Sequence, residues 1–302
     1  MTPKIIRTIA ELREEIAARK SAMTGNPTVG FVPTMGYLHD GHASLLRQSS
    51  SDNGLTVLSI FVNPTQFGPG EDLDKYPRDE QRDLNVAARS GADLVFIPSV
   101  EEMYPRRRAT SVTVSDVTER LCGASRPGHF DGVALVVTKL FNIVQPDRAY
   151  FGMKDAQQIA VIATMVRDLN IPVEIVPCPI VREQDGLALS SRNVYLAPEE
   201  RKQALVLSQS LSRVTEWIRG GMTPQQTIQR LQEEIRRAPL ADIDYVDVLK
   251  YPDLVPAEAD RPLSEADGRL LIAVAVRFGK TRLIDNRLIN PAEVGADICF
   301  AK

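Results

Sequence analysis

The sequence is poor in cysteine and histidine and has no long apolar run. Its three cysteines, Cys122, Cys178 and Cys299, form no Cys-x-x-Cys pair and have no histidine nearby at zinc spacing. We therefore expect reduced, structural cysteines and no zinc site. The longest aliphatic run, Leu270–Val276, is far shorter than the roughly 20 residues that span a bilayer. Charged residues at 11–15 precede any signal-like apolar segment, so the sequence predicts a cytoplasmic protein.

The sequence also lacks a large excess of charge of either sign and the common nucleotide-binding motifs. The 302 residues include 39 acidic and 36 basic side chains, a net charge of −3, so any bound anion must be held locally. The sequence has no Walker-type P-loop, no G-x-G-x-x-G after the first strand and no G-x-S-x-G elbow. These absences argue against Walker kinases and the usual dehydrogenases, and favour phosphate or adenylate chemistry through positioning and charge neutralisation.

The first 180 residues alternate short apolar runs with helical patterns, as βα units do. Continuous apolar runs are typical of strands buried on both faces of a parallel sheet. Strands are predicted at Thr28–Val32, Leu55–Val62, Asp93–Ile97, Ala149–Phe151 and Val173–Val176. Helices are predicted at Ala43–Ser50, Asp79–Arg89, Gly132–Val144 and Ala156–Asp168. The order predicts an α/β fold with a Rossmann-like, doubly wound parallel sheet.

The alternation ends near Leu189. Two amphipathic helices are predicted at Pro198–Arg219 and Thr223–Arg237, followed by strands with hairpin-type pairing at Tyr245–Leu249, Leu270–Val276 and Thr281–Asp285. We expect a nucleotide-binding domain over residues 1–188 and a smaller C-terminal α+β domain over residues 189–302. The boundary is expected within 187–195.

Two of the three histidines lie directly after the first predicted strand, in PTMGYLHDGH at 33–42. A strand that ends in a glycine-containing turn and opens a helix presents backbone N–H groups and a positive helix end where α/β sheets bind ligands. His39 and His42 are suited to donate to phosphate oxygens, and Gly36 and Gly41 let a base or ribose approach the backbone. The alternative is a pair of surface histidines beside a turn.

Two further segments carry groups suited to phosphate. Ser190, Ser191 and Arg192 offer two hydroxyls and a planar guanidinium fork, although a solvated linker is the alternative for an isolated Ser-Ser-Arg. Lys154 follows the strand at Ala149–Phe151 and would neutralise a polyphosphate, unless it is only a solvated loop residue beside the helix cap Asp155.

Neutral amides suggest a pocket for a small polar substrate. Asn63 and Gln66 follow the second predicted strand, and Gln158 begins the helix after Lys154, where a solvent-facing position is the alternative. A Gly/Pro loop carries Arg126 and His129, which either line the site or brace it.

These segments together resemble a known enzyme family. The pair HDGH at 39–42 and LSSR at 189–192 is similar to the signatures of the nucleotidyltransferase superfamily, which includes class I aminoacyl-tRNA synthetases. The further segments are FVNPTQF, YPR, RPGHFDGV, YFGMKDAQQ and RLIDN. In this order they look like the pantoate–β-alanine ligase family, and the resemblance covers essentially the whole chain.

The resemblance implies a two-step reaction. Pantoate and ATP give pantoyl adenylate and pyrophosphate, and β-alanine then displaces AMP to give pantothenate, with Mg²⁺ accompanying the triphosphate. It implies a homodimer and no tightly bound organic cofactor. The balanced charge argues against a nucleic-acid or membrane partner. Because a closed crevice protects an adenylate from water, we expect a lid, supplied by the C-terminal domain.

The resemblance also implies roles for individual residues. His42 and His39 would act on the phosphates, with His42 as proton donor, Lys154 would neutralise charge at the α-phosphate, and Ser190, Ser191 and Arg192 would hold the β and γ phosphates. Gln66, Gln158 and Asn63 would bind pantoate, Gln66 would also bind β-alanine, and Asp83 would lie near the magnesium-bound phosphates. The implied ATP contacts are Met35, Gly36, Tyr37, Leu38, His39, Asp40, Gly41, His42, Gly152, Met153, Lys154, Asp155, Val181, Leu189, Ser190, Ser191 and Arg192.

One residue departs from the family pattern, because Tyr37 stands where the family usually has a small alanine. Its ring must therefore point away from the nucleotide or narrow the pocket mouth. Two other functions compete with the ligase: an adenylyltransferase with a phosphate acceptor, and a nucleotide-binding sensor without catalysis. The neutral Asn63–Gln66 loop argues against the first, and the presence of His42, Lys154 and Arg192 against the second.

Overall fold

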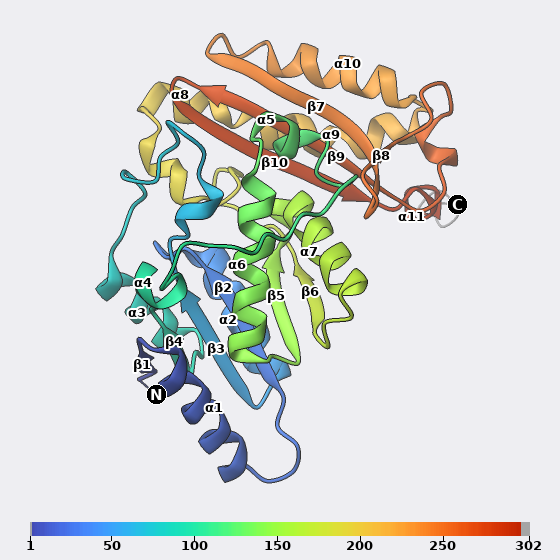
Figure 1. Ribbon diagram of the computed structural model, residues 1–302. Coiled ribbons are helices and arrows are strands. Elements are labelled where there is room, and N and C mark those ends of the chain that lie inside the picture. The colour runs from blue at the N-terminus through green and yellow to red at the C-terminus, as the bar shows by residue number, and fades with distance from the viewer. Residues whose placement is uncertain (1, 297–302) are drawn as a thin grey trace. The chain divides into compact units, whose positions relative to one another are not determined.

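A six-stranded parallel sheet forms the core of the first of two structural units (Figure 1). The computed structural model describes residues 2–296. The sheet has the order β1-β4-β3-β2-β5-β6, and every neighbouring pair is parallel. The strands are β1 Lys4–Ile6, β2 Val29–Thr34, β3 Leu55–Ile60, β4 Leu94–Phe96, β5 Arg148–Gly152 and β6 Glu174–Cys178. The predicted parallel α/β sheet is confirmed. Of its strands only β1 was not predicted, because Ile5 and Ile6, between Lys4 and Arg7, are too short an apolar run to indicate a strand.

Helices cover both faces of this sheet. Phe31 and Val32 are neighbours on β2 and therefore point to opposite faces. Phe31 packs edge-on against Phe141 of α6, whereas Val32 belongs to a cluster with Leu45 and Leu46 of α2. The helices of this unit are α1 Ile9–Ala22, α2 Asp40–Asp52, α3 Glu80–Arg89, α4 Val100–Met103, α6 His129–Val144 and the C-terminal part of α7 Ala156–Asp168. Helices α1 and α4 were not predicted from the sequence.

The strand order places a switch point beside β2. From β2 the chain proceeds to β3 and β4 on one side, and later to β5 and β6 on the other. In such sheets the connections after the two central strands leave in opposite directions, which opens a crevice at their carboxyl ends. The turn at 35–39 follows β2, and Gly152 ends β5, so both implied ATP segments begin at this edge.

The second unit contains an antiparallel sheet. It comprises residues 116–125, 154–160 and the chain from Arg182 onward. Its sheet has the order β10-β9-β7-β8, with β7 Ala241–Tyr251, β8 Val255–Pro256, β9 Arg269–Phe278 and β10 Thr281–Ile289. The predicted hairpin is present, because β9 and β10 pair antiparallel across Gly279 and Lys280. The helices are α5 Leu121–Ser125, α8 Pro198–Ala204, α9 Val206–Arg219, α10 Pro224–Ile235 and α11 Pro291–Ala296.

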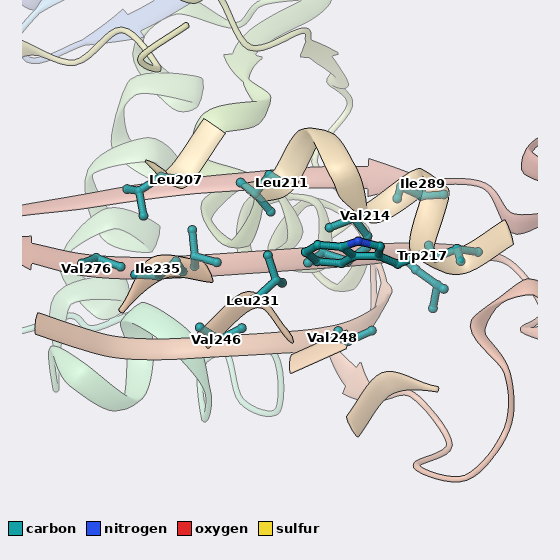
Figure 2. Close-up of a cluster of buried hydrophobic side chains, with 14 of the residues drawn as sticks. Leu207, Leu211, Val214, Trp217, Leu231, Ile235, Val246, Val248, Val276 and Ile289 are labelled. Atoms are coloured by element: carbon teal, nitrogen blue, oxygen red, sulfur yellow. The ribbon is translucent and has the colours of Figure 1, made fainter. Parts of the chain in front are cut away.

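Helices α9 and α10 cover one face of the antiparallel sheet. Figure 2 shows Leu211 and Trp217 of α9 and Leu231 of α10 above the strands. Alternate residues of β9, such as Val274 and Val276, belong to this core, as the period of two requires. The single helix predicted over Pro198–Arg219 is wrong, because the structure divides it at Leu205 into α8 and α9.

Two of the three cysteines can be described. Cys122 and Cys178 are buried free thiols, and burial raises the pKa of Cys178 to about 11, so this thiol is unreactive at neutral pH. Cys299 lies outside the described residues. Within the described part of the chain, no helix combines the length and apolarity that crossing a membrane requires.

Candidate active site

The two histidines of the first motif lie at the start of α2. His39 is the N-cap, and His42 occupies the third helical position. The Nδ1 atom of His39 accepts from the backbone N–H of Gly41 at 3.2 Å, and the Nδ1 atom of His42 accepts from the N–H of His39 at 3.3 Å. The two rings lie against each other with their centroids 4.1 Å apart and their planes tilted by 35°. The helix therefore begins with a reciprocal cap made of two imidazoles.

These contacts fix the tautomers of both histidines. An Nδ1 that accepts from a backbone N–H carries no proton, so each neutral ring carries its proton on Nε2. Both side chains thus present an Nε2–H donor at the positive end of α2. The arrangement suits phosphate oxygens, as expected from the sequence for His39 and His42.

A buried carboxylate holds the turn at residues 35–39, called the histidine turn below. Asp83 of α3 accepts from the backbone N–H of Tyr37 at 2.9 Å and from that of Leu38 at 2.6 Å. Burial raises the pKa of Asp83, and the two backbone donors oppose this shift. Gly36 has a φ of +85°, and a Cβ there would lie 3.0 Å from an Asp83 oxygen. The turn therefore requires glycine at 36 and an acceptor at 83.

Tyr37 leans toward α3. The guanidinium of Arg82 lies 4.4 Å from the centroid of the Tyr37 ring, a cation–π contact. Its backbone is left-handed, with a φ of 51°, which costs a residue with a Cβ on the order of 1 kcal/mol. The two hydrogen bonds that the turn donates to Asp83 offset this cost.

The loop from Asn63 to Gln66, which follows β3 and carries two side-chain amides, contacts the histidine turn. Gln66 ends the 3-10 turn η1 Pro64–Gln66, and its Nε2 donates to the sulfur of Met35 at 3.1 Å. Asn63 donates through Nδ2 to Gln66 Oε1 and to the carbonyl of Gly132, each at 3.1 Å. The hydroxyl of Tyr104 donates to Asn63 Oδ1. Asn63 is 1% exposed, so in this conformation it braces Gln66 rather than facing solvent.

The loop with Arg126 and His129 also braces Gln66. His129 Nδ1 lies 2.8 Å from the carbonyl oxygen of Gln66, which only accepts, so this nitrogen carries the proton. His129 Nε2 then accepts from Arg126, whose guanidinium binds both carboxylate oxygens of Glu71 at 2.6 and 2.7 Å. These contacts favour the bracing interpretation for both residues.

Lys154 and the glutamines of α7 belong to the second unit. Lys154 lies in the 3-10 turn η2 Met153–Asp155, directly after β5, and its side chain is 19% exposed. Its ammonium is 3.6 Å from the carboxylate of Asp155. Gln157 is buried and donates to the carbonyls of Val117 and Arg120, whereas Gln158 is half-buried. Of the two glutamines, Gln157 thus has the structural role and Gln158 keeps partial exposure.

The Ser-Ser-Arg segment forms the start of a short turn. Ser190 caps the 3-10 turn η3 Ser191–Tyr195, and its hydroxyl accepts from the N–H of Arg192 at 3.3 Å. Ser191 is buried and Arg192 half-buried. The segment follows a small hairpin whose ends pair at Arg182 and Ala188. It is therefore anchored and is not a free linker. The implied nucleotide contacts at the two ends of this hairpin, Val181 and Leu189, are half-buried.

Comparisons with known proteins identify the family. A model of the pantoate-beta-alanine ligase family matches residues 4–288. Pantothenate synthetase of Acetivibrio thermocellus is 55% identical over 288 residues, covering 95% of this chain and 99% of that protein. The chain belongs to the pantoate–β-alanine ligase family. It is therefore an enzyme, a ligase of pantothenate biosynthesis.

Solved structures agree with this assignment. The pantothenate synthetase structure from Thermus thermophilus superposes with a TM-score of 0.84 at 48% identity, covering 94% of this chain and 98% of that one. The pantoate-beta-alanine ligase structure from Francisella tularensis has a TM-score of 0.76 at 32% identity and covers 96% and 100% of the two chains. It is described as a complex with beta-gamma ATP and beta-alanine.

In this member of the pantoate–β-alanine ligase family, the residues that hold the site were not recognised as supports from the sequence. The supports are Asp83 under the histidine turn, Glu71 behind Arg126, and Asp285 and Asn286 in the second unit. Asp83 was singled out as a neighbour of metal-bound phosphates, and its contacts with backbone N–H groups gave no sequence signal. Asp285 and Asn286 gave one signal, because they end the segment RLIDN that contributes to the family resemblance, but no role was assigned to them.

Proposed function

We propose that this ligase joins pantoate and β-alanine through a pantoyl adenylate. In the first step a carboxylate oxygen of pantoate forms a bond to the α-phosphorus of ATP, and the bond to pyrophosphate breaks. In the second step the amine of β-alanine attacks the acyl carbon, loses a proton, and displaces AMP. The observation that carries this proposal is the pair of imidazoles, His39 and His42, each capped through Nδ1 by a backbone N–H at the start of α2.

The histidine turn supplies donors where negative charge moves. An oxyanion gains most from donors that are already oriented before the reaction, because no reorganisation is then needed. His39 and His42 are held by backbone N–H groups, and Asp83 fixes the preceding turn. We assign both Nε2–H groups to phosphate oxygens, with the Nε2–H of His42 donating a hydrogen bond to the leaving pyrophosphate.

Lys154 supplies positive charge to the α-phosphate. The pantoate carboxylate and the triphosphate are both anionic, so their approach requires a nearby cation. A unit charge about 4 Å away contributes roughly 4 kcal/mol at an effective dielectric of about 20. Since each 1.36 kcal/mol is tenfold in rate, loss of Lys154 should slow adenylation on the order of a thousandfold.

The remaining residues take the parts that the family resemblance implies. Ser190, Ser191 and Arg192 hold the β and γ phosphates. Gln66 and Gln158 bind the hydroxyl and carboxylate groups of pantoate, Gln66 also contacts β-alanine, and Asn63 keeps Gln66 in place. The other nucleotide contacts are assigned to Met35–His42, Gly152–Asp155, Val181 and Leu189.

The structure is compatible with magnesium that arrives with the nucleotide. Within residues 2–296, no three histidine, cysteine, aspartate or glutamate side chains are grouped as a metal cage. Mg²⁺ commonly uses one or two carboxylates together with substrate phosphates and water. Asp83 accepts one backbone N–H on each oxygen, and each oxygen keeps a further lone pair. Bound Mg²⁺ would neutralise part of the triphosphate charge, and we assign Asp83, which is buried beneath the turn, to the neighbourhood of the magnesium-bound phosphates.

We also propose a homodimer and a lid formed by the C-terminal domain over residues 189–302. The dimer rests on the family resemblance, and the lid rests on the need to keep an adenylate from water. Light scattering after gel filtration tests the dimer, and a monomer mass would overturn it. Small-angle X-ray scattering with and without ATP and pantoate tests the lid, since closure reduces the radius of gyration.

The decisive assay measures pyrophosphate and AMP release from ATP and magnesium. The proposal predicts that pyrophosphate release needs pantoate and that multiple-turnover AMP release also needs β-alanine. Lys154→Ala should lower both rates. Lys250→Ala removes another ammonium, one that pairs with Glu258 at 3.2 Å, and should leave both rates unchanged. Release that ignores pantoate would refute the proposal and favour a transferase with another acceptor.

A further inference from the structure

Two neighbouring polar residues of strand β10 are buried. Asp285 and Asn286 are 3% and 5% exposed, between the core residues Leu283 and Ile289. Burying a charged or amide side chain is costly unless it is fully hydrogen-bonded, so such residues need specific partners. Each of the two holds a different segment of the second unit.

Asp285 holds the segment that leads into the Ser-Ser-Arg turn. Its carboxylate binds the guanidinium of Arg182 through two hydrogen bonds of 2.7 and 2.9 Å. Arg182 also donates to the carbonyl of Gly186 at 3.1 Å. The hairpin from Arg182 to Ala188, which ends one residue before Leu189, is thereby tied to β10.

The far side of this hairpin is tied as well. Asn193 donates to Glu183 at 2.7 Å and to the carbonyl of Ala188 at 3.1 Å. Arg201 of α8 binds the carboxylates of Glu183 and Asp185, each at 2.7 Å. With Asp285 on one side and these contacts on the other, the position of the Ser-Ser-Arg turn depends on the hairpin.

Asn286 holds the lysine segment. Its Nδ2 donates to the backbone carbonyl oxygen of Lys154 at 3.0 Å. This hydrogen bond fixes the main chain from which the Lys154 side chain extends.

The alternation of side chains along a strand explains how two adjacent residues, Asp285 and Asn286, hold two different segments. Side chains at successive positions point to opposite faces of a sheet. Asp285 therefore lies on the same face of β10 as Leu283 and Ile289, which pack in the core beneath the helices, whereas Asn286 lies on the other face. Asp285 also accepts from the N–H of Asn286 at 2.8 Å, so the two side chains are linked through one peptide unit.

We propose that Asp285 and Asn286 are positioning residues that set the ligase's phosphate-binding groups, Arg192 through Arg182 and the hairpin, and Lys154 through its carbonyl. This proposal rests on the nucleotide roles given above to Lys154 and Arg192. Neither residue of the pair needs to contact a substrate. Displacing a catalytic group by about 1 Å can cost on the order of a hundredfold in rate.

The test is a double-mutant cycle between Asn286→Ala and Lys154→Ala, read as pantoate-dependent pyrophosphate release. Asn286→Ala should lower kcat about 10- to 100-fold in the wild-type background and leave the KM for β-alanine unchanged. It should have almost no further effect in the Lys154→Ala background. The control, Asn290→Ala, removes an amide that donates to Glu293 and should behave as wild type. Equal effects of Asn286→Ala in both backgrounds would overturn the proposal.

A second double-mutant cycle tests whether Asp285 positions Arg192. Asp285→Asn keeps the side-chain shape but removes the charge opposite Arg182. Its effect on the KM for ATP should largely disappear in the Arg192→Ala background. Additive effects would overturn the positioning of Arg192. If circular dichroism shows that Asp285→Asn does not fold, Arg182→Lys, which loses the two-bond pair with Asp285, takes its place in the cycle.

Hydrogen exchange separates a failure of this proposal from a failure of the proposed function. Amides of residues 153–158 should exchange faster in Asn286→Ala than in wild type or Asn290→Ala, whatever the reaction. Unchanged exchange there would overturn the positioning of Lys154. Absence of pantoate-dependent pyrophosphate release from wild type would instead overturn the proposed function, and the exchange result would still decide whether Asn286 holds Lys154.

Discussion

The carboxylate of Asp83 should control both the stability and the nucleotide affinity of the histidine turn. Asp83→Asn keeps the side-chain size but offers only one acceptor oxygen to the two N–H groups of Tyr37 and Leu38, now bound at 2.9 and 2.6 Å. One of these donors would then face an amide NH₂ group. The turn already contains two left-handed residues, Gly36 and Tyr37, so its geometry depends on these bonds.

The size of the effect follows from the hydrogen bonds. A hydrogen bond to a charged group contributes roughly 1.5–3 kcal/mol, and an unsatisfied buried donor costs about 1–3 kcal/mol. Burial raises the pKa of Asp83, so the variant regains part of the cost of the buried charge. We predict a net loss of about 2 kcal/mol in the free energy of unfolding. If the same amount is lost from ATP binding, kcat/KM for ATP falls about 30-fold.

Urea denaturation followed by circular dichroism, together with kcat/KM for ATP, measures both effects. The matched control is Asp79→Asn on the same helix. Asp79 is an exposed N-cap that accepts from the N–H of Arg82 at 3.0 Å, and asparagine caps helices equally well. The control should match wild type. If Asp83→Asn also matched wild type in unfolding midpoint and kcat/KM, the assignment of Asp83 as the anchor of the turn would be wrong.

Three further predictions follow from burial and packing. Burial raises the pKa of Asp83, so ionising this carboxyl costs more free energy in the folded protein than in the unfolded chain. The stability advantage of wild type over Asp83→Asn should therefore shrink as the pH rises from the ordinary pKa of 3.8 through the raised pKa. Urea midpoints measured against pH test this, and an advantage that grew with pH would contradict it. Gly132→Ala would place a Cβ 2.6 Å from the Cα of Gln66 and should raise the KM for pantoate. In the control Gly68→Ala, the nearest atoms to the new Cβ, on the Glu71 side chain, are 3.9 Å away, so the KM should not change. Equal KM values for the two variants would refute the effect of the Gly132 contact. Trp217→Ala should destabilise the second unit by roughly 3–5 kcal/mol, whereas Leu240→Ala, 42% exposed in wild type, should change little, as thermal melts followed by circular dichroism would show.

The fold was largely readable from the sequence because its strands are continuous apolar runs between clear helical patterns. Five of the six parallel strands and the β9–β10 hairpin were predicted within a few residues. The misses have physical causes. Strand β1 lies at the sheet edge and has only two consecutive apolar residues, Ile5 and Ile6, too few to indicate a strand. The division at Leu205 has no glycine or proline to announce it, and Leu205 itself keeps helical dihedral angles.

The sequence points to candidate phosphate-binding groups more readily than to the residues that support them. The histidine, lysine and Ser-Ser-Arg segments stand out because side chains of these types are suited to bind phosphate, and their roles stay predictions. The residues that hold them contact backbone atoms, such as Asp83 with the N–H groups of Tyr37 and Leu38, and Asn286 with the carbonyl of Lys154. Such contacts join positions far apart in the sequence and depend on tertiary structure, so no local pattern reveals them.

The adenylate intermediate is the central claim, and isotope transfer tests it most directly. Pantoate labelled with ¹⁸O in its carboxylate is incubated with ATP, magnesium and β-alanine, and the products are analysed by mass spectrometry. The account predicts one ¹⁸O atom in AMP for each pantothenate formed, because a carboxylate oxygen bonds to the α-phosphorus. Unlabelled AMP, or label in inorganic phosphate together with ADP, would contradict it.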